Sequence, residues 1–337
     1  MKQFSGKTKD RFTLGIDIGT HTIKAVKLKI AKDNKASICD YYLEPIQMDL
    51  EQVLKKISTA SQVKNAVVSV SGLSVILRYI DFPKMNDAEL RQALKFEAQK
   101  HIPFSLNEVN LDGYILNSSL PDNKMLVLLA AAKKDFINQR VKVVEGSGLF
   151  INLIDIDSLA VINAFLFNYG QQENVKTKTV ALLNIGSAFS NLNILESGVP
   201  RLSRDIHIGG SNITQRIADA TGENFKVAEE LKINSAIKKA KDFAAAIDLV
   251  LSNLASEVRT SFDYYESQSA SSVEKIFLSG GGSLLAGLKE KLSSYIGIEV
   301  EIWDTFSQIS TENITETDKL KEKAAQLAVA TGLALRG

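Results

Sequence analysis

The amino-acid sequence predicts an α/β fold built from two related lobes. The chain has 337 residues, of which 45% are hydrophobic and 23% charged, and this length suits more than one compact core. Apolar runs with strand character alternate with helical segments, as in α/β proteins with mixed sheets. A polar residue and a glycine separate two apolar runs at residues 14–20, and the same pattern returns 167 positions later at residues 181–187. A repeat at nearly half the chain length indicates an internal duplication.

Charge and cysteine content exclude several classes of function. Lys and Arg number 40 and Asp and Glu 39, so no overall field attracts nucleic acid or anionic lipid. The single cysteine, Cys39, cannot form an internal disulfide, and the three histidines lack the spacing of metal ligands. No apolar segment is long and uninterrupted enough for a membrane span, and the basic, polar start is unlike a signal peptide. We therefore expect a cytoplasmic protein that reaches a membrane only through partners.

Each half is expected to open with a β-hairpin, and the first half then continues into an inserted module. The first hairpin pairs residues 14–18 with residues 23–30, and the module spans residues 41–133. Its helix runs from Asp87 to about His101, because Asn86 and Glu89 form a capping box and Pro103 stops the helix. The remaining elements predicted up to residue 170 are strands at 66–71, 75–80, 109–116, 125–132 and 150–156, the last of them between two helices.

The second half shows the same alternation of strands and helices. Its hairpin is followed by a strand at 201–208 and a helix capped by Ser211. Residues 224–267 are charged, periodic and free of proline, which predicts helices. The remaining predictions are a strand at 273–278, a loop at 279–283 and helices at 284–295 and 319–330.

Three glycine turns carry the strongest chemical signal: the first turn (residues 17–20), the second turn (184–187) and the third turn (279–283). Without a Cβ, glycine lets the backbone approach a ligand and direct N–H groups at phosphate oxygens. A carboxylate at Asp17 could orient the water shell of a magnesium ion. A single turn of this kind is equally typical of an ordinary hairpin, but repetition at matched positions favours a shared function. Neither a Walker motif nor a Rossmann glycine motif is present.

The chain resembles the actin-like ATPases, and within them the PilM family of type IV pilus assembly, which is related to the cell-division protein FtsA. Residues 15–19, which overlap the first turn, resemble the first phosphate loop of the family. Residues 184–190 resemble the second phosphate loop, and residues 279–283 the adenosine loop. The segments that most resemble the PilM family in particular are residues 82–85, 97–104, 155–158 and 198–210.

This resemblance implies an actin-like, ribonuclease H-like fold of two lobes with an FtsA/PilM-type inserted subdomain. The implied divisions are a first lobe (1–40, 134–175 and 317–337), the inserted subdomain (41–133), a second lobe (176–217 and 272–316) and a helical subdomain (218–271).

The resemblance also implies ATP and Mg²⁺ as cofactors and assigns roles to individual residues. Asp17 would hold Mg²⁺, partly through water, and with Asp157 would be the catalytic candidate. Glu229 and Lys232, three apart on a helix, would contact ribose and base; the alternative is a solvated ion pair. For Asp157 the alternative is a helix N-cap. The other implied nucleotide contacts are Gly15, Gly19, Thr20, Asn184, Gly186, Ser187, Ser190, Gly209, Gly210, Gly280, Gly281 and Gly282.

The function implied by the resemblance is a cytoplasmic ATP-binding adaptor at the inner face of the inner membrane. It would dock the cytoplasmic N-terminal tail of the membrane protein PilN and meet other pilus inner-membrane and motor components. Phe82, Phe96 and Phe104 of the inserted module would be apolar contributors to the groove, although burial in the core is the commoner role for a large aromatic side chain. The family's second loop carries an aspartate where this chain has Asn184, so we expect ATP to bind and hydrolysis to be slow or absent. The alternative functions are an FtsA-like cell-division filament protein and, less favoured, a small-molecule kinase of the actin-like superfamily. Another copy of the chain is a further candidate partner.

Overall fold

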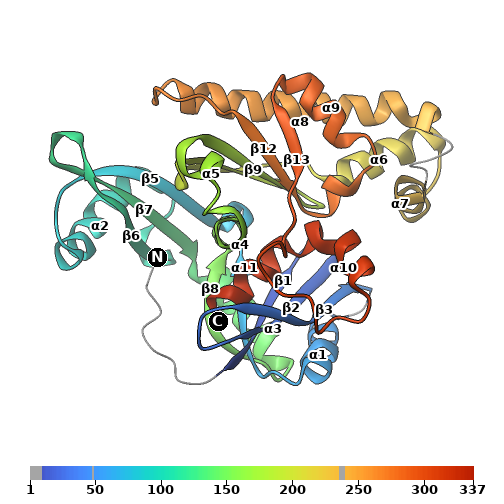
Figure 1. The fold of residues 1–337 in the computed structure, drawn as a ribbon, viewed down its shortest axis with the longest axis horizontal. Helices are drawn as coiled ribbons and strands as arrows, with labels where there is room; N and C mark the ends of the chain where they lie inside the picture. Colours follow the sequence, from blue (N-terminus) through green and yellow to red (C-terminus); the bar gives the residue numbers. More distant parts are fainter. Residues whose placement is uncertain (1–9, 48, 235–239) are drawn as a thin grey trace.

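The structure is a computed structural model that describes residues 10–47, 49–234 and 240–337. Two five-stranded sheets form the centres of two lobes, and a three-stranded sheet lies beside them (Figure 1). Parts of the expected first lobe (residues 1–9) and of the helical subdomain (235–239) lie outside the described residues.

The two large sheets share one topology. The first has the order β3-β2-β1-β4-β8 and the second β11-β10-β9-β12-β13. In both, the central strand pairs antiparallel with the strand that follows it and parallel with a later strand. The duplication predicted from the glycine turns is therefore present in the strand order. The strands are β1 (Arg11–Ile18), β2 (Thr22–Ile30), β3 (Ala36–Pro45), β4 (Asn65–Val70), β8 (Phe150–Ile156), β9 (Thr179–Ile185), β10 (Ser190–Glu196), β11 (Val199–Ile206), β12 (Lys275–Ser279) and β13 (Glu299–Ile302).

The third sheet has the order β5-β7-β6 and forms the inserted module with helix α2 (Asp87–His101). Its strands are β5 (Val75–Pro83), β6 (Val109–Leu120) and β7 (Lys124–Lys133). The capping box of Asn86 and Glu89 is present, as predicted. The module does not begin at residue 41, however, because β3 and β4 both pair within the first large sheet. An apolar strand of six residues such as β4 carries no signal that tells which sheet it will join.

Helices cover the faces of the sheets. They are α1 (Leu50–Ser61), α3 (Lys134–Gly146), α4 (Asp157–Tyr169), α5 (Glu173–Thr177), α6 (Gly210–Thr221), α7 (Phe225–Asn234), α8 (Ala240–Glu266), α9 (Leu288–Ile296), α10 (Thr317–Lys323) and α11 (Ala328–Arg336).

Three helix boundaries differ from the sequence prediction. The N-cap of α6 is Gly209 rather than Ser211, and the Asn212 side chain accepts a hydrogen bond from the Gly209 N–H. Helix α9 begins at Leu288 instead of residue 284, since Gly287 has a φ of 76° and breaks the helical path. The terminal helix is divided into α10 and α11 by the 3₁₀ turn η5 (Ala324–Leu327).

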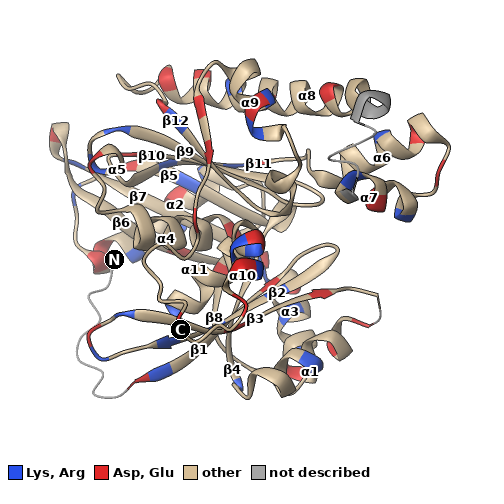
Figure 2. Ribbon diagram, turned by 45° about the vertical axis from the view of Figure 1, so that its right-hand side comes forward, with Lys and Arg blue, Asp and Glu red and all other residues tan. Residues whose placement is uncertain are grey.

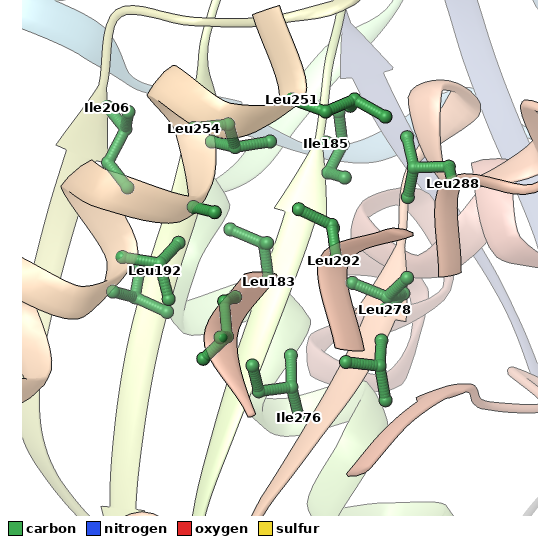
Figure 3. Packing of buried hydrophobic residues seen from close by; sticks show 14 of the residues in the cluster. Leu183, Ile185, Leu192, Ile206, Leu251, Leu254, Ile276, Leu278, Leu288 and Leu292 are labelled. Atoms are coloured by element: carbon green, nitrogen blue, oxygen red, sulfur yellow. The ribbon is translucent and has the colours of Figure 1, made fainter. Parts of the chain in front are cut away.

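Each lobe has its own apolar core. The core of the second lobe lies where α6, α8 and α9 cover its sheet (Figure 3). A second cluster joins the lobes, and in it Phe165 and Tyr169 of α4 contact Phe277 and Trp303. Basic and acidic residues are interspersed over the two lobes and the inserted module (Figure 2). Among the described residues, no helix combines the length and the apolar character that crossing a bilayer requires.

Candidate functional site

The first turn places a buried carboxylate beside an amine. Asp17 ends β1 with 6% of its surface exposed, and Lys24 stands opposite it on β2. The Lys24 Nζ lies 2.8 Å from the Asp17 carboxylate. Sequence reasoning missed Lys24, although the hairpin register around Gly19 makes residues 17 and 24 partners. The first turn therefore presents a cation and an anion together.

Asp157 lies near Asp17 at the first residue of α4. The helix is capped by Ile156, so the interpretation of Asp157 as an N-cap is wrong. Burial is the larger cause and the nearby Asp17 charge the second, and together they raise the pKa of Asp157 to about 7. Hydrogen bonds from Ser69 and Ser71 act in the opposite direction and lower this pKa. The two carboxylates named as catalytic candidates, Asp17 and Asp157, are therefore close enough for the charge of one to affect the pKa of the other.

Arg140 of α3 is a second cation near these carboxylates. Burial lowers the pKa of its guanidinium, and the charges of Asp157 and Asp17 oppose that shift. The described residues provide no carboxylate within 4.0 Å of Arg140, and its Cζ lies 5.8 Å from the centroid of the Phe136 ring. Nothing in the sequence pattern distinguished Arg140 from the other cations of its helix.

The second turn is held by the start of α6. The Gly210 N–H donates to the Gly186 carbonyl and the Ser211 N–H to the Ser187 carbonyl, both at 2.9 Å. An added Cβ at Gly209 would overlap the Ser187 carbonyl oxygen. Glycine at position 209 therefore permits this close packing.

Asn184 lies at the base of the second turn with 8% of its surface exposed. Its Oδ1 accepts a hydrogen bond from the Ser279 hydroxyl at 3.2 Å, and its Nδ2 donates to Asn191 at 3.4 Å. Asn184 and Asp17 occupy the same place in the two duplicated hairpins. The second lobe accordingly offers a neutral amide where the first offers a charge.

A side-chain contact connects the first and second turns. The Ser187 Oγ lies 2.7 Å from the His21 Nδ1 and 2.7 Å from the Ser211 Oγ. Because His21 follows Gly19 and Thr20, this bond places the two turns next to each other. The sequence does not single out His21, because an isolated histidine matches no ligand spacing.

Lys232 and Glu229 form a network with the first residues of α6. The Lys232 Nζ lies 2.7 Å from Glu229 and donates to the Gly210 carbonyl at 3.2 Å and to the Thr214 Oγ1 at 2.9 Å. The Thr214 hydroxyl also donates to Glu229. The Lys232 side chain is 14% exposed, so the alternative of a solvated surface pair is wrong for the lysine.

The third turn packs against the second. Gly280 has a φ of 85°, and an added Cβ would overlap the Ile185 carbonyl oxygen. Its N–H donates to the Ala325 carbonyl at 2.7 Å, which ties the third turn to η5 of the first lobe. A Cβ at Gly282 would overlap the Ile185 side chain, whereas one at Gly281 would meet Gln326 at 3.8 Å or more. Only Gly281 of the three leaves room beside it.

Two predicted contacts have other roles in the structure. A Cβ at Gly15 would overlap the backbone of Ala330 and Ala334, so this glycine allows α11 to pack on β1. The Ser190 side chain is fully buried, and its hydroxyl donates to the Ile208 carbonyl at 2.7 Å. The sequence alone does not distinguish a glycine that allows a helix to pack closely on the strand from a glycine that allows a ligand to approach the backbone. Thr20, by contrast, is exposed on the first turn.

The donor set suits a magnesium ion held mainly through phosphate and water. No cluster of three or more His, Cys, Asp or Glu suited to a metal occurs in the described part of the chain. Asp17 and Asp157 repel each other, and a divalent cation beside them would relieve that repulsion. A site of one or two carboxylates completed by substrate phosphates is the usual form for Mg²⁺.

A separate cavity of about 350 Å³ lies between the inserted module and the second lobe. Strands β5 and β11 line it, and each is an edge strand that pairs with a single neighbour among the strands that the structure describes. The Tyr79 hydroxyl contacts the Ser203 hydroxyl at 2.8 Å beside it. The cavity is lined by Ser71, Gly72, Leu73, Val75, Ile76, Leu77, Arg78, Pro103, Phe104, Ile156, Ser158, Asn191, Ser203, Arg204, Asp205 and His207.

The three phenylalanines expected to contribute to a partner groove differ in position. Phe104 lines the cavity, and the Lys133 Nζ lies 4.6 Å from its ring centroid. Phe82 is buried in the core of the module, and Phe96 is 77% exposed on α2. Of the three, Phe104 is the residue that the structure places at the cavity.

The family follows from a comparison along the whole chain. The family model described as type IV pilus assembly protein PilM matches residues 15–337. The chain belongs to the PilM family. A solved structure described as a PilM-PilN type IV pilus biogenesis complex has a TM-score of 0.85 and 27% identity to it, over 96% of this chain and 98% of that chain. The PilM prediction from the sequence motifs is therefore confirmed.

Two more distant structures share the fold. The ethanolamine utilization protein EutJ from Carboxydothermus hydrogenoformans has a TM-score of 0.57 and 15% identity, over 97% of this chain and 90% of that chain. Component A of the Acidaminococcus fermentans (R)-2-hydroxyglutaryl-CoA dehydratase has a TM-score of 0.50 and 13% identity, over 97% of both chains. These neighbours agree with the actin-like fold predicted for this PilM-family chain.

Proposed function

We propose that this PilM-family chain is a nucleotide-binding adaptor of type IV pilus assembly. It binds ATP with Mg²⁺ between its first and second turns and docks the cytoplasmic tail of a PilN-type membrane protein on its inserted module. The observation that carries the nucleotide part is the contact between His21 and Ser187, which brings the two duplicated turns within one hydrogen bond of each other.

The residues around the turns have the chemistry that a triphosphate requires. Lys24 would balance phosphate charge, and Asp17 would hold Mg²⁺ through its water shell. Bound Mg²⁺ would neutralise charge on the phosphates. Lys232, largely buried against the first turn of α6, and its half-exposed partner Glu229 would contact the ribose and base. Asp157, in its deprotonated form, would orient a water molecule.

Slow or absent hydrolysis follows from Asn184. The second turn supplies an amide whose oxygen is already hydrogen-bonded to Ser279, so it adds no charge that could order Mg²⁺ and the attacking water. ATP binding does not require a carboxylate on the second turn, since the glycine turns and the charges of Asp17 and Lys24 are still present to hold the phosphates. The chain would therefore be a weak ATPase at most.

The partner part of the proposal rests on the cavity between β5 and β11. An extended peptide could add to an unpaired strand edge while its side chains enter the cavity. The protein would then lie at the inner face of the inner membrane through its partner. The complex of the related PilM with PilN supports the choice of partner.

Calorimetry on the purified chain tests both parts. We expect saturable binding of ATP in the presence of Mg²⁺, and loss of most of that binding in Lys24→Met. We also expect binding of a synthetic PilN cytoplasmic tail, with a scrambled peptide as control. Failure of ATP or of the tail to bind would refute the corresponding part, and rapid steady-state phosphate release would refute slow hydrolysis.

A further inference from the structure

His21 occupies a position between the lobes that the proposed function does not explain. It directly follows the first turn, and its Nδ1 lies 2.7 Å from the Ser187 hydroxyl of the second turn. That hydroxyl is also 2.7 Å from the Ser211 hydroxyl in the first turn of α6. The three side chains form a short chain of hydrogen bonds from the first lobe to the second.

A second contact holds the imidazole on its other side. The His21 ring and the Phe225 ring at the start of α7 are nearly parallel, with an interplanar angle of 13° and centroids 6.1 Å apart. His21 therefore touches both the second turn and the helical subdomain. Both contacts would change if the lobes moved apart.

The serine hydroxyls that His21 engages are donors suited to phosphate. Hydroxyl groups next to a helix N-terminus commonly donate to anionic oxygens. A nucleotide whose phosphates lie between the two turns must take up space beside Ser187, and the imidazole occupies that space. The His21–Ser187 hydrogen bond and phosphate binding therefore compete for the same hydroxyl.

We propose that His21 competes with the nucleotide phosphates for the Ser187 hydroxyl and thereby sets the affinity of the site for nucleotide. This inference rests on the proposed function. In the ligand-free protein His21 holds the first and second turns together through Ser187. An incoming polyphosphate displaces the imidazole, and the cost of breaking this contact lowers affinity and slows association.

Substitution of His21 tests this competition directly. His21→Ala removes the bond to Ser187 and the contact with Phe225, so we expect it to bind ATP–Mg²⁺ about five-fold more tightly, the equivalent of one ordinary hydrogen bond. Stopped-flow fluorescence with a labelled ATP analogue is expected to show faster association. Phe225→Leu removes the ring contact alone and is expected to shift both quantities in the same direction by a smaller factor.

The controls separate this inference from the proposed function. His101→Ala changes a histidine at the end of α2, away from the turns, and is expected to leave ATP binding unchanged. Unchanged or weaker ATP binding by His21→Ala, with a normal melting temperature, would overturn the inference. If the wild-type chain bound no ATP, then the proposed function itself would fail, whatever the behaviour of the variants.

Discussion

The Lys24 ammonium and the Asp17 carboxylate lie 2.8 Å apart across the first hairpin, and both are largely buried. Beside them Asp157 adds a second carboxyl and Arg140 a second cation. Burying charges is costly unless each has a partner, so such a group indicates a binding function rather than a contribution to stability. The four residues come from three segments that are distant in sequence.

The first prediction concerns pH. The pKa of Asp157 rises from 3.8 to about 7 on folding, because burial and the Asp17 charge disfavour its ionised form. Between these values the folded chain holds a proton that the unfolded chain has lost, so this group's contribution to stability is lost as the pH rises from about 4 to 7. Urea unfolding across this range is expected to show a steeper loss of stability in wild type than in Asp157→Asn. Equal slopes for the two proteins would contradict the assignment, and Asp122→Asn, on the exposed turn between β6 and β7, serves as the control.

The second prediction separates two kinds of glycine. Gly15→Ala places a methyl group against the backbone of α11 and is expected to lower the free energy of unfolding by more than about 2 kcal/mol. Gly281→Ala meets only Gln326 atoms at 3.8 Å or more and is expected to change it by less than about 0.5 kcal/mol. Thermal and urea unfolding measure both. A stable Gly15→Ala variant would show that the packing assigned to this glycine is wrong.

The third prediction tests the departure at Asn184. Asn184→Asp restores a carboxylate to the second turn and is expected to raise Mg²⁺-dependent phosphate release by about tenfold or more. Some loss of stability should accompany it, because Asn191 presents an oxygen to this position and the residue is buried. Asn191→Asp is the matched control: it adds a buried charge beside Asp205 without placing one on the turn. Similar release rates in both variants would count against the role of position 184.

The fourth prediction concerns the partner cavity. Phe104→Ala is expected to weaken binding of the PilN tail by about tenfold, since large aromatic side chains in pockets dominate peptide binding. Phe96 lies on the same module but outside the cavity, so the affinity of Phe96→Ala for the PilN tail should be within twofold of the wild-type value. ATP affinity should be unchanged in both, and circular dichroism checks that the module is folded. Equal losses for the two variants would place the tail elsewhere.

The internal duplication and the three glycine turns are readable in the amino-acid sequence, and segments of it suffice to recognise the PilM family. These features depend on local patterns: apolar runs of strand length, glycines at turns, and the Asn86 capping box at the start of α2. Such patterns are set by neighbouring residues, so they are readable without tertiary structure. Asp17 was recognised for the same reason, because it ends an apolar strand before a glycine.

The tertiary structure alone decided which distant residues meet. It assigned β3 and β4 to the first sheet, Gly15 to the packing of α11 and Ser190 to an internal hydrogen bond. It also placed His21 next to Ser187, across more than 160 residues of chain. Contacts of this kind depend on how two lobes pack against each other, and the chemical type of a residue does not encode its partner across such a distance.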